Sequence, residues 1–454
     1  MFDILIVILA VIFVLGIAIN IHEFGHFAVA KLFGMRVDAY SFFGLGPRIW
    51  GFKYGHTDYR ISAIPLGAYV KLYGDEATGP LEGKDEQGEV VPESELYELR
   101  PKWQKFLVMI GGPFMNLLLA LAIPFAGALM YGLPSMPAPI VEFVKASGAA
   151  ELAGIKTGDR IKNFDGTEDP TWERIEHDAM VSPEREVPLT VERGGERLNL
   201  TIKPTKTMRG DNAMGDLDLL PATDAEPVIV GAIEANMPAA QVLQKSDRVI
   251  AFNDQSVRNT TTLREMIGQT KGTPFKLTIE RGGERKVVDI NATETPDGYR
   301  IGVGFARDEI KTREPANIAQ AATFAVNSNL EIIRLTGKVF GQLFTGQRSV
   351  KEAGVAGPIG IVQIISKVVH EQGFVGLVSI LALISLNLGV FNLLPIPMLD
   401  GGQIAVLGIE GFLGLFGLTL SMAIKEKIQL VGLAVILLLM VTTIFFDISR
   451  LIGR

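Results

Sequence analysis

The sequence predicts a polytopic α-helical membrane protein with four transmembrane helices, a strand-rich connection and two inserted copies of a small α+β domain. Four charge-free stretches of 18 residues or more interrupt a 454-residue chain in which 20% of residues are charged. They cover residues 4–21, 106–133, 372–399 and 428–446. Because about 20 apolar residues cross the hydrocarbon core, each stretch predicts one membrane span. A sequence repeat between the second and third spans predicts the two inserted domains.

Composition excludes several classes of function. The net charge is −7, the isoelectric point is about 5.5 and no basic stripe occurs, so no nucleic-acid partner is expected. The absence of cysteine excludes disulfides and thiolate chemistry, but it does not identify the compartment. The N-terminal run MFDILIVILA lacks a basic region and a nearby small-residue cleavage site. It therefore predicts a retained span and not a signal peptide.

Basic residues around the spans predict the topology. Lys and Arg residues are frequent near both ends of segment 34–102, whereas the three residues before the first span include no Lys or Arg. The positive-inside rule therefore places this segment in the cytoplasm and the N-terminus outside. Lys425 and Lys427 agree with this orientation, and Arg450 and Arg454 oppose it weakly. The basic residues that predict this orientation are Lys31, Arg36 and Arg48 after the first span and Arg100, Lys102 and Lys105 before the second span.

The cytoplasmic connection has two parts. Residues 40–74 combine aromatic and β-branched residues with Gly and Pro, a pattern that predicts short antiparallel strands. This part is also apolar enough to dip into the membrane boundary. Residues 75–98 hold nine acidic residues and one lysine, which predicts a solvated loop.

The segment between the second and third spans contains an internal repeat. LTVERGGER (189–197) recurs as LTIERGGER (277–285), and GDRIKNFDG (158–166) recurs as SDRVIAFND (246–254), both with an offset of 88 residues. Two motifs with one offset predict two copies of one domain. Both copies resemble PDZ domains of bacterial membrane and periplasmic proteases, and the alternative is a pair of structural β-domains without a peptide site. In the second copy the shorter VLQKSD replaces LAGIKTGD, which makes peptide binding there less secure.

HEFGH at residues 22–26 matches the H-E-x-x-H pattern. On a helix, His22 and His26 project from one face and can share one Zn²⁺, and Glu23 can act as the general base on a water molecule. The alternative is a polar cluster near a helix end. His22 lies about 27 Å along the helix from Ile4, at about 1.5 Å per residue, so the cluster is expected inside the bilayer near its cytoplasmic side. Ionisable groups there are costly, which favours a compensating metal.

The third zinc ligand must reach the same membrane depth. Asp400 ends NLGVFNLLPIPMLDGG (387–402) at the predicted cytoplasmic end of the third span, so its depth matches that of the histidines. His56 is the weaker alternative, because His177 and His370 fall on the other side of the membrane. Pro395 and Pro397 break this span, and irregular backbone at membrane depth indicates a buried or cavity-lining segment.

Asn387 and Asn392 place two amides on the same segment. They could hold neighbouring helices together, or they could bind substrate or an oxyanion. Beside a metal site, we favour the second interpretation.

The motifs HEFGH, NxxPxPxxDG and the tandem repeat together resemble the site-2 protease family, over nearly the whole chain. The resemblance implies zinc-dependent intramembrane proteolysis with one Zn²⁺ per chain. It implies that His22, His26 and Asp400 are the metal ligands, that Glu23 is the catalytic base, and that Asn392 and Asn387 bind substrate. GGPFMN (111–116) resembles the glycine-proline motif of the family's second span.

Three further features follow from the resemblance. The family's membrane-re-entrant β-region corresponds to residues 36–74, with Gly44 and Gly46 in its G-x-G turn and in contact with substrate. Gln403 stands where many relatives have a basic residue, and this difference changes the surroundings of the ligands without removing one.

The resemblance also implies the location and the partners. The protein is expected in the bacterial inner membrane, with both termini and the PDZ domains periplasmic and the active site near the cytoplasm. The expected partners are the lipid bilayer and single-span substrates such as a trimmed anti-sigma factor or signal-peptide remnants. The PDZ pair is expected to filter these substrates by size. No oligomeric state is predicted.

The predicted organisation has eight segments. They are the first transmembrane helix with HExxH (1–33), the β-region and acidic loop (34–102), the second transmembrane helix (103–133), the first PDZ domain (134–222), the second PDZ domain (223–312), amphipathic interfacial helices (313–371), the third transmembrane helix with NxxPxPxxDG (372–410), and a loop with the fourth transmembrane helix (411–454).

Two rival functions use the same residues. In a non-catalytic membrane adaptor, the PDZ pair would bind peptides and the histidines would hold a structural metal, but Glu23 would then have no role. In a metal or proton transporter, the intramembrane carboxylate and histidines would form the pathway. Four spans are few for a transporter, and the tandem domains would have no role in it.

Overall fold

The computed structural model describes residues 2–64, 67–74, 91–134, 137–209, 212–222, 228–257, 259–296, 298–305, 313–354 and 356–452. Contacts divide the chain into two units. We call them the helical unit (Met1–Gly132, Pro315–Arg334 and Val355–Arg454) and the repeat unit (Leu133–Glu314 and Leu335–Gly354). Residues 75–90 of the predicted acidic loop lie outside the described residues.

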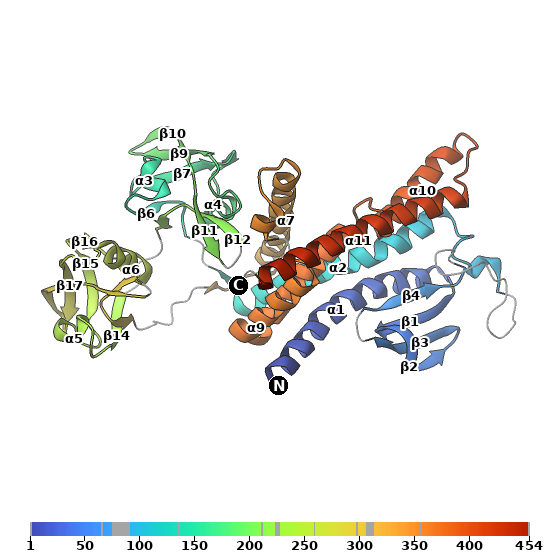
Figure 1. Cartoon of the computed structure of the whole chain (residues 1–454), viewed down its shortest axis with the longest axis horizontal. Coiled ribbons are helices and arrows are strands. Elements are labelled where there is room, and N and C mark those ends of the chain that lie inside the picture. Colours follow the sequence, from blue (N-terminus) through green and yellow to red (C-terminus); the bar gives the residue numbers. More distant parts are fainter. Residues whose placement is uncertain are drawn as a thin grey trace. The chain divides into compact units, whose positions relative to one another are not determined.

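Among the described residues, four helices are long and apolar enough to cross a membrane, as the sequence predicts (Figure 1). They are α1 (Phe2–Leu32), α2 (Lys102–Tyr131), α9 (Pro358–Asn392) and α11 (Met422–Ile452). Side chains of α1 and α9 form a buried core that includes Val14, Ala18, Ile365 and Leu377. The candidate span on α1 also carries the HEFGH sequence, which therefore lies on a continuous helix.

Helix α9 differs from the span predicted at 372–410. It begins at Pro358, contains a backbone break at Gly373 with φ of +62°, and ends at Asn392. A short connection with Pro395 and Pro397 follows, and α10 (Asp400–Gly414) begins at the aspartate of the motif. Proline lacks a backbone N–H, and two prolines separated by one residue remove two helical hydrogen bonds, so the sequence LLPIPML separates the two helices.

The β-region forms one four-stranded sheet. Its strands are β1 (Val37–Phe43), β2 (Leu45–Tyr54), β3 (Thr57–Ile64) and β4 (Tyr69–Leu72), in the order β2-β3-β1-β4. The prediction of antiparallel strands is wrong for one pair, since β1 and β3 run parallel. This happens because the β2–β3 hairpin folds back so that β3 inserts between β2 and β1.

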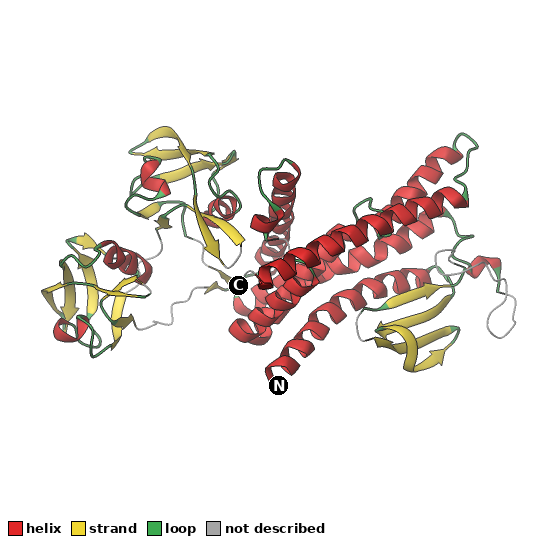
Figure 2. Ribbon diagram, viewed as in Figure 1, coloured by secondary structure: helices red, strands yellow, loops and turns green. Residues whose placement is uncertain are grey.

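The repeat unit contains two copies with the same order of elements, drawn as mixed helices and strands in Figure 2. In each copy, a strand, a short helix, a strand pair, a longer helix and a hairpin follow one another. The first copy has β6 (Val141–Val144), α3 (Ala149–Leu152), β7 (Arg160–Phe164), β8 (Thr167–Glu168), α4 (Trp172–Met180), β9 (Val187–Arg193), β10 (Glu196–Ile202), β11 (Thr205–Arg209), β12 (Asn212–Asp216) and β13 (Leu219–Pro221).

The second copy repeats this pattern. Its elements are β14 (Val228–Ile233), α5 (Ala239–Val242), β15 (Arg248–Phe252), β16 (Gln255–Ser256), α6 (Thr260–Gln269), β17 (Phe275–Arg281), β18 (Glu284–Ile290), β19 (Thr293–Thr295), β20 (Gly298–Arg300) and β21 (Val303–Phe305). Strands β7, β9 and β10 begin 88 residues before β15, β17 and β18, which is the offset of the sequence motifs. Each copy has its own apolar core.

The same ion pair, between a buried aspartate and a partly exposed arginine, occurs in each copy. Arg193 donates to both carboxylate oxygens of Asp159 at 2.7 Å, and Arg281 does the same to Asp247 at 2.7 Å. Burial alone would raise the pKa of both aspartates, but the hydrogen bonds from arginine and from a backbone N–H outweigh it and lower each pKa. The repeated GDR, SDR and ERGGER sequences therefore encode one structural contact.

The remaining elements connect these parts. Strands β5 (Leu133–Pro134) and β22 (Arg313–Glu314) pair where the chain enters and leaves the two copies. Helix α7 (Ile318–Phe344) contributes to both units, and α8 (Val350–Ala353) and the 3₁₀ helix η1 (Glu93–Glu95) complete the described structure. Within the repeat unit, Nζ of Lys338 on α7 donates to Asp165 and Asp178 of the first copy at 2.6 and 2.7 Å.

Candidate metal centre

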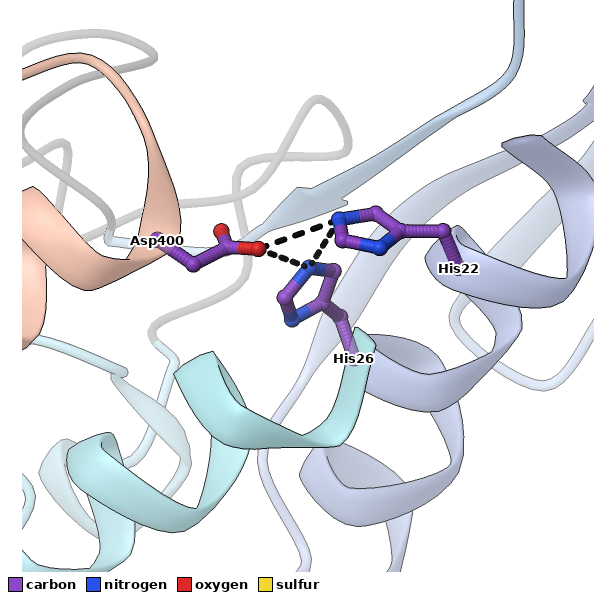
Figure 3. Close-up of side chains that lie close together, drawn as sticks. All are labelled: His22, His26 and Asp400. Carbon is purple, nitrogen blue, oxygen red and sulfur yellow. Dashed lines mark hydrogen bonds and ion pairs between the residues drawn. The ribbon is translucent and has the colours of Figure 1, made fainter. Parts of the chain in front are cut away.

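Three side chains converge in the helical unit, as Figure 3 shows. Nε2 of His22 and Nε2 of His26 lie 3.3 Å apart, and they lie 3.0 and 3.5 Å from Oδ2 of Asp400. Four residues separate the histidines on α1, which puts both rings on one helix face. Ligand atoms about 2.0–2.1 Å from a tetrahedral zinc lie about 3.3–3.4 Å from one another. The triangle of ligand atoms therefore has the size that a zinc ion requires.

The carboxylate of Asp400 fits a cation at this point. Its Oδ2 is buried and accepts no well-aligned hydrogen bond from any residue that the structure describes. The side chain is 14% exposed, and its Oδ2 faces the two imidazole nitrogens. A buried carboxylate oxygen without a donor is costly, and a cation between the three atoms would remove that cost.

The second nitrogen of each ring has its own partner. Nδ1 of His26 donates to the backbone carbonyl of Val108 at 2.7 Å, and a carbonyl can only accept. Nε2 of His26 is therefore free to bind a metal. Nδ1 of His22 lies 3.1 Å from the side-chain amide of Asn116 on α2. Partners of this kind commonly fix the tautomer of a metal-binding histidine.

Glycines bring α1 and α2 close together beside the proposed metal ligands. A Cβ atom on Gly25 of α1 would lie 2.1 Å from the carbonyl oxygen of Gly111 on α2. A Cβ atom on Gly112 would lie 2.4 Å from Nε2 of His26, which is a proposed ligand atom. A side chain at residue 112 would therefore occupy the space of the metal centre. The small residues of GGPFMN permit close helix packing, but nothing in that sequence shows that Gly112 faces the metal centre.

Two further glycines place Asp400. A Cβ atom on Gly401 would lie 2.3 Å from the carbonyl oxygen of Leu394, and one on Gly402 would lie 2.2 Å from that of Ile396. The first turn of α10 therefore packs directly on the proline-containing connection before it. This close packing directs the carboxylate of Asp400 toward α1.

A cavity of about 280 Å³ opens beside the three side chains. Glu23 lines it, and its Oε2 accepts a hydrogen bond from the backbone N–H of Val70 on β4 at 3.1 Å. Nδ2 of Asn392 lies 3.2 Å from Nε2 of His22. The lining residues are His22, Glu23, His26, Val70, Leu72, Met109, Asn392, Met398, Leu399, Asp400 and Gln403. A base, an amide and a strand edge thus face one space.

Other predicted residues lie elsewhere. His56 is exposed in the turn between β2 and β3, and Asn387 is partly buried on α9 without lining the cavity. Gly44 and Gly46 lie at the junction of β1 and β2, with φ of +95° and +87°. The N–H of Gly44 donates to the carbonyl of Gly67 at 2.8 Å. In the described chain, β4 and not this junction reaches the cavity.

Comparisons with known proteins cover nearly the whole chain. The family model described as Peptidase family M50 matches residues 10–439. The chain is 31% identical to the regulator of sigma-E protease RseP of Salmonella typhimurium over 472 residues, which cover 97% of this chain and 98% of that protein. It is 29% identical to the regulator of sigma E protease of Haemophilus influenzae over 461 residues, covering 97% and 98% of the two chains.

A third relative is protease RseP of Yersinia pestis, at 30% identity over 468 residues, 97% of this chain and 98% of that one. Among solved structures, the PDZ domain of an SdrC-like protein from Listeria monocytogenes is 22% identical, with a TM-score of 0.17 over 19% of this chain and 93% of that one.

Proposed function

Because this chain belongs to Peptidase family M50, the site-2 protease family, we propose that it is a zinc-dependent endopeptidase that cleaves transmembrane segments of single-span proteins. One observation carries the proposal. The HEFGH motif lies on a candidate membrane span, and its two histidines meet Asp400 from a distant part of the chain. Three protein ligands with space beside them are typical of a catalytic zinc site.

His22, His26 and Asp400 would hold one Zn²⁺. When bound, the zinc supplies Lewis-acid chemistry that polarises a carbonyl group and makes water more acidic. Glu23 is the general base, because its carboxylate lines the same cavity and its Oε2 is held by the N–H of Val70. In this role it takes a proton from the attacking water and later gives it to the leaving amine.

The substrate would bind in an extended conformation between β4 and α9. A transmembrane helix hides its peptide groups, so cleavage requires local unwinding and new hydrogen-bond partners. Strand β4 lies at one edge of its sheet and contributes Val70 and Leu72 to the cavity wall. An extended segment can add to such an edge. Nδ2 of Asn392 would donate to the substrate backbone from the opposite wall.

The two glycines at the β1–β2 junction and Asn387 remain predicted substrate contacts. Gly44 and Gly46 would shape the sheet that receives the substrate, and Asn387 would act from the helical turn before Asn392. Substitution of each residue tests this role through the Michaelis constant for a single-span substrate.

The proposed location is the inner membrane, with the termini and the two copies outside and the metal centre near the cytoplasm. The two copies are proposed to be PDZ domains that filter substrates by size. Relatives named regulator of sigma-E protease support a role in sigma-E regulation, and an anti-sigma factor is the proposed substrate. A cysteine introduced at exposed Leu152 tests this topology: labelling from outside intact spheroplasts is expected, and protection would invert the orientation.

Cleavage of a single-span substrate by the purified full-length chain tests the proposal. Glu23→Gln should retain zinc and lose cleavage, because it removes the base and leaves the three ligands. If the chain is a non-catalytic adaptor, the wild-type protein and Glu23→Gln should both bind zinc, and neither should cleave the substrate. If Glu23→Gln cleaves at the wild-type rate, the proposed mechanism is wrong.

A further inference from the structure

A chain of buried polar groups connects three helices behind the metal centre. Nδ2 of Asn116 on α2 lies 3.1 Å from Nδ1 of His22 on α1. Ser385 on α9 donates from Oγ to the backbone carbonyl of Asn116 at 2.9 Å, and its Oγ lies 3.3 Å from Oδ1 of that residue. Asn116 and Ser385 are fully buried. Their polar groups therefore depend on one another and on His22.

Metal binding through Nε2 fixes what Nδ1 of His22 must do. A neutral imidazole carries one N–H, so when Nε2 binds a metal, Nδ1 carries the proton and needs an acceptor. The carbonyl of Val108 provides that acceptor for His26. For His22, the neighbouring group is an amide, which can present either its oxygen or its NH₂.

One orientation of the Asn116 amide satisfies the whole chain. It is reached by turning over the amide, whose Nδ2 faces His22 and whose Oδ1 faces Ser385 in the structure. Oδ1 then accepts the proton of Nδ1, and Nδ2 donates to Oγ of Ser385. The hydroxyl of Ser385 still donates to the backbone carbonyl of Asn116. The opposite orientation would point an NH₂ group at the N–H of His22, which leaves buried donors without acceptors.

We propose that Asn116 is a positioning residue that holds His22 with Nδ1 protonated and with Nε2 directed at the metal. Ser385 acts on Asn116 by selecting the orientation of its amide. This inference rests on the zinc site of the proposed function, but it does not depend on the substrate. Both residues act through His22 and touch no reacting atom.

Zinc affinity of the full-length protein, measured by competition with a chelator, tests the proposal. Loss of such an outer partner typically weakens metal binding 10–100-fold. Asn116→Ala is expected to lower the affinity by about that factor. Asn116→Asp should keep affinity close to wild type, because a carboxylate accepts the same proton. With Co²⁺ in place of zinc, the visible absorption bands should shift in Asn116→Ala and return in Asn116→Asp.

Asn329→Ala is the matched control. Nδ2 of Asn329 donates to the carbonyl of Ala120 on α2 at 3.1 Å, so this buried amide also connects a helix to α2, but away from the metal ligands. It is expected to lower the melting temperature and leave zinc affinity unchanged. Equal zinc affinities in wild type and Asn116→Ala would overturn the proposal, as would equal losses in the alanine and aspartate variants.

If Asn116→Ala does not fold, Ser385→Ala provides a second test of the proposal. Removing one hydroxyl should preserve the helices and weaken zinc binding in the same direction, by a smaller factor. Wild-type affinity in Ser385→Ala would contradict its assigned role. A wild-type protein that binds no zinc would instead refute the proposed function, so the two failures are distinguishable.

Discussion

Nε2 of His22 on α1 and Oδ2 of Asp400 at the start of α10 lie 3.0 Å apart. This pair joins the first candidate span to the segment that follows the third. It forms because the proline-containing connection after α9 brings the first residue of α10 beside His22. Metal binding and the packing of these distant segments are therefore expected to depend on each other.

Asp400→Ala should remove the carboxylate ligand and lower zinc affinity by more than about 100-fold, since even outer partners contribute 10–100-fold. The measurement is zinc competition on the purified protein, beside His56→Ala, whose side chain is exposed in a turn outside the cluster. The control should bind zinc as wild type does. If His56→Ala loses zinc affinity and Asp400→Ala keeps it, His56 is the third ligand.

Gly112→Ala should abolish zinc binding without unfolding the helical unit. The added Cβ would lie 2.4 Å from Nε2 of His26, so a methyl group would displace a ligand atom. Gly127→Ala on the same helix is the control, because its Cβ would meet no atom within 4 Å. Zinc content and the melting temperature in detergent separate the two effects. Zinc binding by Gly112→Ala at wild-type affinity would exclude this geometry.

The convergence of three proposed metal ligands could be predicted because membrane depth leaves few alternatives. A charge-free run, two histidines on one helix face and one carboxylate at matching depth favour His22, His26 and Asp400 over the alternative with His56. The roles of Gly112 and Asn116 could not be identified in this way. They depend on which helix packs against the imidazole rings, and no pattern within α2 reveals that partner.

The start of the third span and the pairing of the β-strands also could not be predicted fully from the sequence. Lys367, His370 and Glu371 interrupt the apolar run, so a search for charge-free sequence begins the third span at residue 372. A further helical segment lies before the break at Gly373 and extends back to Pro358, because charge does not by itself end a helix. The parallel β1–β3 pair could not be predicted from the strand pattern either, because that pattern does not show that β3 inserts between β2 and β1.

The repeat unit should lose stability as the pH falls below about 4, the usual pKa of an aspartate. The pKa of Asp159 and that of Asp247 are lowered in the folded protein, since the hydrogen bonds to arginine outweigh burial. Their stabilisation is complete above the unfolded pKa and disappears as the pH falls through the lowered value. Urea unfolding at pH 7, 4 and 3, followed by fluorescence of Trp172 in a background with Trp50 and Trp103 replaced by Phe, measures this effect in the first copy.

Asp159→Asn provides the comparison. It should be less stable than wild type at pH 7, because Arg193 loses its charged partner, and its stability should change less between pH 4 and 3. An unchanged slope in this variant would show that other groups cause the acid sensitivity. Asp169→Asn is a suitable control, because its exposed carboxylate binds Lys162 at the surface.

Asp447 on α11 should hold the beginning of α9 in place. Its carboxylate accepts hydrogen bonds from the backbone N–H groups of Gly357 and Gly360 at 3.1 and 2.9 Å, and the residue is 3% exposed. The first N–H groups of a helix have no partner within the helix, and a carboxylate at this position satisfies them and interacts favourably with the helix dipole. Asp447→Ala should therefore leave two buried N–H groups unpaired, at about 1–3 kcal/mol each.

The expected result is a clear fall in the melting temperature of the detergent-solubilised protein, with faster hydrogen exchange at residues 357–362. Asp447→Asn should retain part of the stability, because its amide oxygen still accepts. Thr442→Val tests the specificity of the effect, since the Thr442 hydroxyl bonds only to the carbonyl of Leu438 on its own helix among the described contacts. Equal melting temperatures for Asp447→Ala and Thr442→Val would mean that α11 does not anchor α9 through this carboxylate.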